Sequence, residues 1–241
     1  MLSNVVVEIM SSEFILWRCL HGGPLTKETI DHPKPHPDVP WDRIRARNIP
    51  FLAKLTEVYG SCAVIARDGT QIVGQLRFYP KAICSMAASG PGLCMQQIFP
   101  NGPADDFVEH NFPRLDQVAD KTLFVHCMMT GSPQQKDNPY QRKGFGSRMV
   151  RTLIDWAQPK GWSAIEANAY ADLPSLYAIT GQAGRTFWEK LGFRMIESTI
   201  ESAFVEGGNE GFVDVILREA ADRGMDAEAA KAKYTMRLDL A

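Results

Sequence analysis

The sequence predicts a mixed α/β (α+β) fold, with a mostly antiparallel central sheet that is flanked by helices and carries insertions. Three observations predict this class. Short β-rich runs alternate with amphipathic helical stretches along the chain. An Asp-Gly pair at Asp68-Gly69 joins two such runs, which is a strong hairpin signal. Segments rich in Gly and Pro separate the elements, and no internal repeat is present.

The composition is that of an ordinary globular chain. Of 241 residues, 45% are hydrophobic and 22% are charged, which excludes wholesale disorder. A net charge of −2 offers no overall basic surface for nucleic acid or an anionic membrane. A run of about 18 apolar residues, as a spanning helix needs, does not occur. The N-terminal stretch 1–10 carries Glu8 and no basic residue, so it is a poor signal peptide.

Cysteine usage indicates a reducing compartment. The five cysteines are odd in number and include no CxxC pair, so we expect neither a disulfide framework nor a zinc finger. The sequence therefore predicts a cytoplasmic protein.

In the N-terminal half we expect a strand, a helix and a hairpin. The strand covers Glu13–Leu20, and the helix begins at Trp41 and extends to Tyr59, kinked or split near Ile49 by Pro50. Between them, four prolines in Asp31–Pro40 favour an extended loop. The hairpin joins runs 62–66 and 71–79, and little periodicity follows over 81–120.

The C-terminal half alternates strands and helices. We expect these elements in chain order: a strand at 123–127, an amphipathic helix from Phe145 that ends before Pro159, a strand at 163–170, a helix at 185–191, a strand at 195–205, a helix around 213–220 ended by Gly224, a short helix capped by Asp226, and a strand at 234–240.

The stretch Asn138–Ser147 carries the clearest chemical signal. Gly144 and Gly146 let a ligand approach the backbone at the start of the amphipathic helix, where unpaired N–H groups and the helix dipole favour an anion. Arg142 and Lys143 add positive charge, so the segment suits a pyrophosphate. The alternative is a Gly-rich helix start with solvated basic residues. The spacing matches neither a P-loop nor a Rossmann fingerprint.

Here the sequence resembles the GNAT superfamily of acyl-CoA-dependent N-acyltransferases. Its Q/R-x-x-G-x-G/A loop is matched by Gln141–Gly146, and its N-x-x-A-x-x-Y-E-K-L-G-F signature falls on Gln182–Phe193. The resemblance implies a single domain over 1–241. Its core covers about 13–20, 41–80, 121–205 and 233–240, and its insertions cover 21–40, 81–120 and 206–232.

The resemblance also implies acetyl-CoA as cosubstrate. It assigns cofactor binding to Cys127, Met128, Met129, Gln141, Arg142, Lys143, Gly144, Phe145, Gly146, Ser147, Gln182, Arg185 and Trp188. Three of these depart from the family pattern: Gln182 stands for Asn, Arg185 for a small residue, and Trp188 for a tyrosine beside the sulfur. Because an indole N–H is no proton source near neutral pH, Trp188 is interpreted as packing or as a wall of the acyl site.

The implied reaction is direct transfer of an acetyl group to a primary amine in a ternary complex. Backbone N–H groups near the end of the strand at 125–129 would polarise the thioester carbonyl. His126 is the candidate base, with an ordinary sheet histidine as the alternative, and Glu166 is a weaker candidate base. Tyr177 is a candidate acid. Covalent catalysis by Cys127 is a remote alternative, since a buried strand cysteine is usually inert.

We expect no metal. His32 and His36 have a spacing that suits a helix, but the surrounding prolines exclude a helix there. The partner is a small-molecule or peptide amine; nucleic acid and membranes are not expected, and a homodimer is left open. Two other functions stay open: a catalytically weak or inactive CoA-binding regulatory module, and an interaction domain in which the glycines only start a helix.

Overall fold

The chain divides into two compact units, Met1–Ser163 and Ala164–Ala241. The computed structural model describes residues 4–18, 20, 25–26, 30, 41–87, 112–131, 137–180, 182–205 and 210–240. The expected loop at 31–40, with His32 and His36, lies outside these residues. The expectation of a single domain over 1–241 stays a prediction. No helix among the described residues is both long and apolar enough to cross a membrane.

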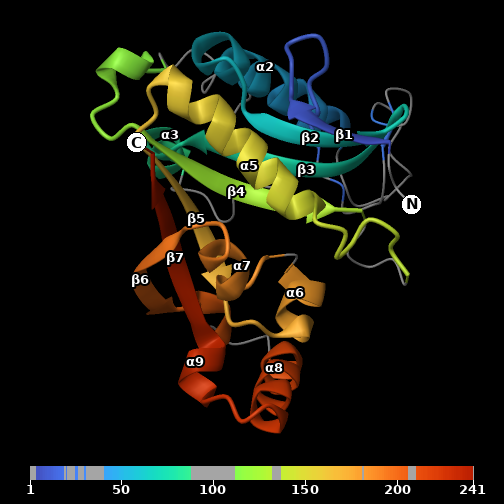
Figure 1. The fold of residues 1–241 in the computed structure, drawn as a ribbon, viewed down its shortest axis with the longest axis vertical. Coiled ribbons are helices and arrows are strands. Elements are labelled where there is room, and N and C mark those ends of the chain that lie inside the picture. The colour runs from blue at the N-terminus through green and yellow to red at the C-terminus, as the bar shows by residue number, and fades with distance from the viewer. Residues whose placement is uncertain are drawn as a thin grey trace. The chain divides into compact units, whose positions relative to one another are not determined.

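The first unit is built on four antiparallel strands (Figure 1). Their order is β1-β2-β3-β4, and their bounds are Val5–Ile9 for β1, Ala63–Asp68 for β2, Gln71–Pro80 for β3 and Thr122–Thr130 for β4. The predicted hairpin is confirmed as β2–β3, which pairs Asp68 with Gln71 and turns at Gly69 with a φ of 59°. The predicted strand at 123–127 is confirmed as the first part of β4, which continues to Thr130.

The strand expected at Glu13–Leu20 is wrong, and β1 supplies the first strand instead. Leu16 and Trp17 are fully buried, but in an irregular segment. Side chains satisfy its backbone: Arg77 donates to the Leu16 carbonyl, and Asn48 Nδ2 donates to the Trp17 carbonyl over 3.0 Å. The apolar residues of 13–20 are therefore buried in the core without strand hydrogen bonding. The three valines that begin β1 have the β-branched composition that strands favour.

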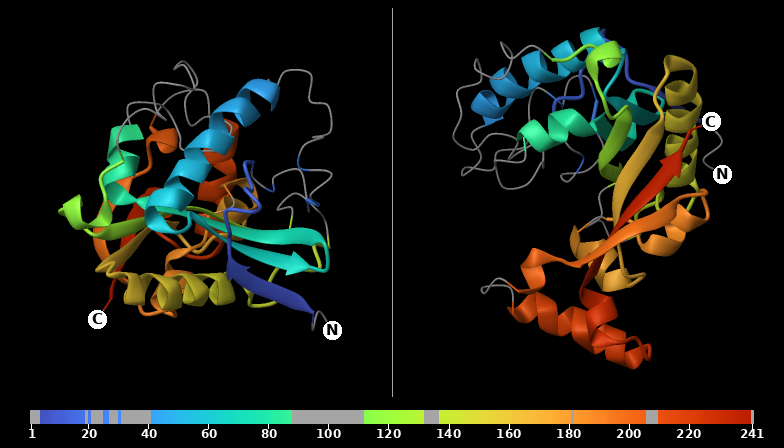
Figure 2. Two further views of the ribbon diagram at one scale, coloured as in Figure 1. Left: turned by 90° about the horizontal axis from the view of Figure 1, so that it is seen from above. Right: turned by 90° about the vertical axis from the view of Figure 1, so that its left-hand side faces the viewer.

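Helices cover both faces of this four-stranded sheet. Helix α5 (Phe145–Ala157) lies on one face and α2 (Trp41–Tyr59) on the other (Figure 2). The predicted amphipathic helix is confirmed as α5, with Phe145, Met149 and Leu153 on its buried side. Helix α2 runs through Pro50 without being split. Helix α3 (Lys81–Ala87) follows β3 where no helix was expected, and the short 3-10 turns are Leu115–Gln117 and Gln158–Lys160.

The second unit has three antiparallel strands in the order β5-β7-β6. They are β5 (Ala164–Tyr170), β6 (Arg194–Ile200) and β7 (Ala232–Asp239). Strand β6 is shorter than expected, because a 3-10 turn at Ser202–Phe204 replaces its end. The other expected strands of this half are confirmed.

Helices of the second unit pack among themselves and on β5 and β7. They are α6 (Pro174–Thr180), α7 (Arg185–Glu189), α8 (Glu210–Asp222) and α9 (Ala227–Lys231). The predicted caps are confirmed: Gly224 is left-handed after α8, and the Asp226 carboxylate accepts from Glu228 N and Ala229 N at α9. Leu173, Leu176, Ile216 and Ala230 share one buried cluster, so the expected insertion at 206–232 supplies part of this core. Helix α6 was not expected.

Both units therefore have the predicted class, a mostly antiparallel sheet flanked by helices.

Candidate functional site

The loop before α5 is anchored by Asn138. Its Nδ2 donates to the Thr130 carbonyl over 2.9 Å, and its Oδ1 accepts from Tyr140 N over 3.0 Å. The Tyr140 hydroxyl reaches Asp68 Oδ2 in the β2–β3 turn over 3.1 Å. Burial and the Asp68 carboxylate both raise the pKa of Tyr140, so it stays a neutral donor. These contacts tie the loop to the ends of β4 and β2.

Helix α5 begins with an exposed, positively charged turn. Gly144 is its N-cap residue at a φ of 80°, and no described atom lies within 4 Å of the place where its Cβ would be. The first helical bond of this turn runs from Arg148 N to Gly144 O, so the N–H groups of Phe145, Gly146 and Ser147 precede the hydrogen-bonded ladder. Arg142, also left-handed at a φ of 56°, and Lys143 are exposed beside them.

This turn has the properties of an anion site. A backbone without a side chain at Gly144, three N–H groups at a helix N-terminus and two cations all favour an oxyanion at the same place. The predicted loop residues are therefore brought together: Gln141 and Ser147 are half-buried, and Phe145 packs into the core with Tyr140 at a ring-centroid distance of 6.4 Å.

Strand β4 carries a bulge at His126. Arg77 of β3 pairs with Cys127 and Phe78 pairs with Val125, so the register skips His126. A bulge interrupts the ladder and re-aims side chains and N–H groups locally. Cys127 and Met128 are half-buried, and Met129 is buried.

His126 is held neutral. Its ring stacks on Tyr79 with a centroid distance of 5.7 Å and an interplanar angle of 27°. Burial, and secondly the charge of Arg77, lower the pKa of His126 to about 3. Its Nε2 is buried and has no hydrogen-bond partner among the described residues. The imidazole is therefore a neutral proton acceptor at pH 7, though a weak base.

In the second unit, Asp172 caps α7 from outside the helix. Its Oδ2 accepts from Thr186 N over 3.1 Å and from Thr186 Oγ1 over 2.6 Å. Arg185 lies over the ring of Tyr234 at 5.5 Å and pairs with Glu189 over 2.5 Å, a hydrogen bond that raises the pKa of Arg185. Gln182 is half-buried just before the helix.

Trp188 is enclosed by aromatic rings. It is buried, with edge-on contacts to Phe187 at 5.2 Å and to Phe193 at 4.9 Å between ring centroids. Its Nε1 is buried without a hydrogen-bond partner in the described part of the chain.

The other two candidate catalytic residues also lie in the second unit. Glu166 on β5 is buried and forms an ion pair with Arg237 Nη1 of β7 over 2.8 Å. Tyr177 is half-buried on α6. The roles predicted for these residues, and for those on β4 and α7, stay predictions.

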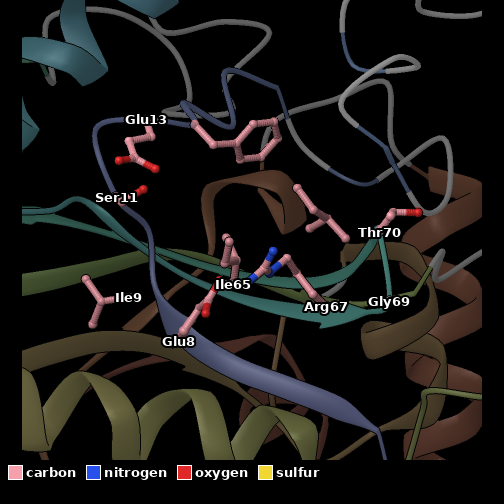
Figure 3. Close-up of a pocket in the computed structure, with 10 residues that line it drawn as sticks. Glu8, Ile9, Ser11, Glu13, Ile65, Arg67, Gly69 and Thr70 are labelled. Atoms are coloured by element: carbon pink, nitrogen blue, oxygen red, sulfur yellow. Dashed lines mark ion pairs between the residues drawn. The ribbon is translucent and has the colours of Figure 1, made fainter.

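A pocket of about 420 Å³ lies in the first unit, on the sheet face opposite α5 (Figure 3). Its lining residues are Glu8, Ile9, Ser11, Glu13, Phe14, Ile65, Arg67, Gly69, Thr70 and Ile72. Glu8 and Arg67 form an ion pair of 2.5 Å on its floor, while Ser11 and Glu13 belong to the segment above the strands. The sequence alone did not predict this pocket, because the pocket depends on how the irregular segment 11–14 crosses the sheet.

Sequence reasoning also assigned no role to Asn138, Asp172 and Arg77. Asn138 is the first residue of the predicted stretch, and an Asn side chain that accepts from the backbone N–H two residues later, here Tyr140 N, is a recognisable turn signal. No local signal marks Asp172 or Arg77, whose partners are distant along the chain. Among the residues that the structure describes, no three His, Cys, Asp or Glu side chains lie close enough together to hold a metal ion.

No protein-family model matches the chain, and no curated protein matches it either. Solved structures are similar to the chain at low identity over nearly its whole length. Agmatine N-acetyltransferase, as its S171A mutant, is 14% identical, with 98% of this chain and 100% of that chain covered at a TM-score of 0.46. The mosquito arylalkylamine N-acetyltransferase like 5b is 13% identical, with 98% and 100% covered at 0.47. A GNAT-family acetyltransferase from Streptococcus pneumoniae is 12% identical, with 98% and 99% covered at 0.47.

Proposed function

We propose that the protein is a GNAT-type N-acetyltransferase that transfers the acetyl group of acetyl-CoA to a primary amine. The observation that carries this proposal is the exposed turn at the start of α5, where left-handed Gly144 leaves the backbone N–H groups uncovered between Arg142 and the helix. A pyrophosphate is the ligand that best fits such a turn.

In this proposal the N–H groups of the turn, with Arg142 and Lys143, hold the pyrophosphate of CoA. The thioester supplies an activated acetyl group. The neutral amine attacks the thioester carbonyl carbon, the new C–N bond forms as the C–S bond breaks, and CoA leaves as a thiolate. Backbone N–H groups at the β4 bulge are proposed to stabilise the oxyanion, and His126 Nε2 is proposed to accept the proton that the amine loses.

The cofactor roles of Cys127, Met128, Met129, Gln182, Arg185 and Trp188 belong to the same proposal, as does a cytoplasmic location. Trp188 supplies packing here and no proton, which agrees with its enclosure by Phe187 and Phe193.

Calorimetric titration of acetyl-CoA tests the phosphate turn. The R142E/K143E double variant reverses two charges beside the helix N-terminus, and we expect a loss of 10-fold to 100-fold in affinity. The matched control is Arg151→Glu, an equally exposed arginine near the middle of the same helix, with less than a 3-fold effect expected. Equal affinities in both variants would overturn the assignment.

Thiol release with a panel of amines separates an enzyme from a regulatory module. Turnover with at least one amine is expected of the enzyme. Tight acetyl-CoA binding without turnover on any amine would favour the module instead.

A further inference from the structure

One face of the first unit's sheet carries buried polar atoms that are not hydrogen-bonded. Gln75 Oε1, Arg77 Nε and Nη1, and His126 Nε2 lie on β3 and β4, and Arg67 Nε on β2 is a fifth such atom; each is without a partner among the described residues. Gln75 and Arg77 are both 0% exposed. Buried polar atoms in folded proteins are nearly always paired, so four of them on two adjacent strands need an explanation.

The register places these side chains on the same face. A Cβ at Gly74 would contact Met149 of α5, so the α5 side of β3 is the side of residue 74. Gln75, Arg77 and Tyr79 alternate with it and face the opposite side. His126 stacks on Tyr79, and Gln75 Nε2 lies 3.8 Å from Cys127 Sγ, so the β4 residues of the cluster share this face.

Arg77 is a buried cation, and no carboxylate of the described residues pairs with it. Its Nη2 donates to the Leu16 carbonyl, and within the described part of the chain its charge acts on Cys62, which it also hydrogen-bonds, and on Tyr79 and His126. None of the ion pairs found in the described ranges includes Arg77. A buried charge is costly unless an opposite charge and full hydrogen bonding compensate it. The N–H groups at Arg77 Nε and Nη1 are therefore available as hydrogen-bond donors to an anionic oxygen.

We propose that this cluster, Gln75, Arg77 and His126, is the acceptor site and that the acceptor is an amine which also carries a carboxylate. The carboxylate of the acceptor pairs with Arg77. The N–H groups of its amine donate hydrogen bonds to His126 Nε2 and Gln75 Oε1. This inference rests on the proposed function and adds the substrate class. A molecule with both groups satisfies all four buried atoms, whereas a simple amine leaves Arg77 uncompensated.

The same arrangement links binding to proton transfer. The Arg77 charge is the second cause that lowers the pKa of His126. A carboxylate beside Arg77 offsets that charge, so a bound acceptor raises the pKa of His126 and makes it a better base.

Open space exists on this face. Ile65 lines the 420 Å³ pocket and is also the register partner of Gln75, so the pocket lies one strand away from the cluster. The segment 11–14 above the pocket continues directly into Leu16, whose carbonyl accepts from Arg77.

Matched substrate pairs test the proposal. Each pair is an amino acid and its decarboxylated amine: alanine with ethylamine, phenylalanine with phenylethylamine, and lysine with cadaverine. For at least one pair we expect kcat/KM, measured by thiol release, to favour the amino acid 100-fold or more. Arg77→Met should reduce that preference below 5-fold with acetyl-CoA affinity unchanged, and Arg77→Lys should retain most of it. Arg67→Met is the matched control, since Arg67 lies on the same face and the Glu8 carboxylate compensates its charge through Nη2, although its Nε is also without a partner among the described residues.

Two readouts keep this test independent of turnover. Calorimetry of alanine, phenylalanine and lysine into the protein, with and without CoA, should give binding of at least one amino acid that Arg77→Lys retains, and NMR titration of His126 should show its pKa rise when that amino acid binds. Equal turnover of both members of every pair, or a preference that survives Arg77→Met, overturns the substrate class and leaves the acetyltransferase proposal intact. Failure of acetyl-CoA to bind overturns the proposed function, and amino-acid binding by calorimetry then decides the site separately.

Discussion

The side-chain amide of Asn138 occupies the space that a side chain at Gly131 would fill. Gly131 directly follows β4 with a φ of 61°, and its N–H donates to Val73 O over 2.6 Å. Its lack of a side chain lets Asn138 reach the Thr130 carbonyl and brace the loop that leads into α5.

Gly131→Ala should therefore destabilise the protein and weaken acetyl-CoA binding together. The new methyl group displaces the Asn138 amide and breaks two hydrogen bonds, worth about 2 kcal/mol beyond the backbone strain. Gly161→Ala is the control, because Gly161 has a similar φ of 83° and no described atom near its Cβ position. Urea unfolding and calorimetry measure both effects; equal losses in the two variants would contradict the bracing role.

Asp172→Ala should destabilise the second unit by about 1 to 2 kcal/mol, because it removes the acceptor that caps Thr186 at the start of α7. Asp172→Asn keeps an acceptor oxygen and should lose less. Gly184→Ala should resemble Asp172→Ala, since its Cβ would approach the Asp172 Cα to 3.1 Å. Thermal unfolding ranks the three, and an unperturbed Gly184→Ala would refute the close packing.

His126 should make the folded state sensitive to mild acid. Its pKa of about 3 lies below the unfolded value near 6.5, so between these values the unfolded chain binds more protons. Unfolding free energy is then unaffected by His126 at pH 7 and falls by about 1.4 kcal/mol per pH unit below about 6.5. Burial raises the pKa of Tyr79, so its hydroxyl stays neutral over this pH range.

His126→Phe keeps a ring against Tyr79 and removes the titration. Urea unfolding from pH 7 to pH 4 should therefore show a shallower decline in the variant than in the wild type. Parallel declines would mean that the imidazole is protonated in the folded protein.

Arg237→Met should cost more stability than Glu166→Gln. The first removes the guanidinium that pairs with the buried Glu166 carboxylate, whereas the second leaves Arg237 its contact with Asp239 over 2.7 Å. Arg194→Met breaks an exposed pair with Asp239 and should cost the least of the three. A larger loss in Glu166→Gln than in Arg237→Met would reverse this assignment of the buried charge.

Local sequence signals predicted the elements whose stability is local. The Asp68-Gly69 turn, the α5 periodicity and the Asp226 cap each depend on residues a few positions apart, and each is confirmed. The prediction of a strand at 13–20 was wrong because its apolar residues are buried in an irregular segment that forms no strand hydrogen bonds. Helices α3 and α6 are seven residues long, too short for a clear periodic signal.

By itself, the sequence determined the glycine turn at the start of α5 and its positive charge, because a helix N-terminus takes its chemistry from adjacent residues. Only the tertiary structure decided what surrounds Arg77 and His126. Their neighbours come from β2, β3, β4 and the irregular segment near Leu16, and the cost of burying a charge depends on such distant partners. Turn chemistry is therefore readable along the chain, whereas burial and pairing are properties of the folded sheet.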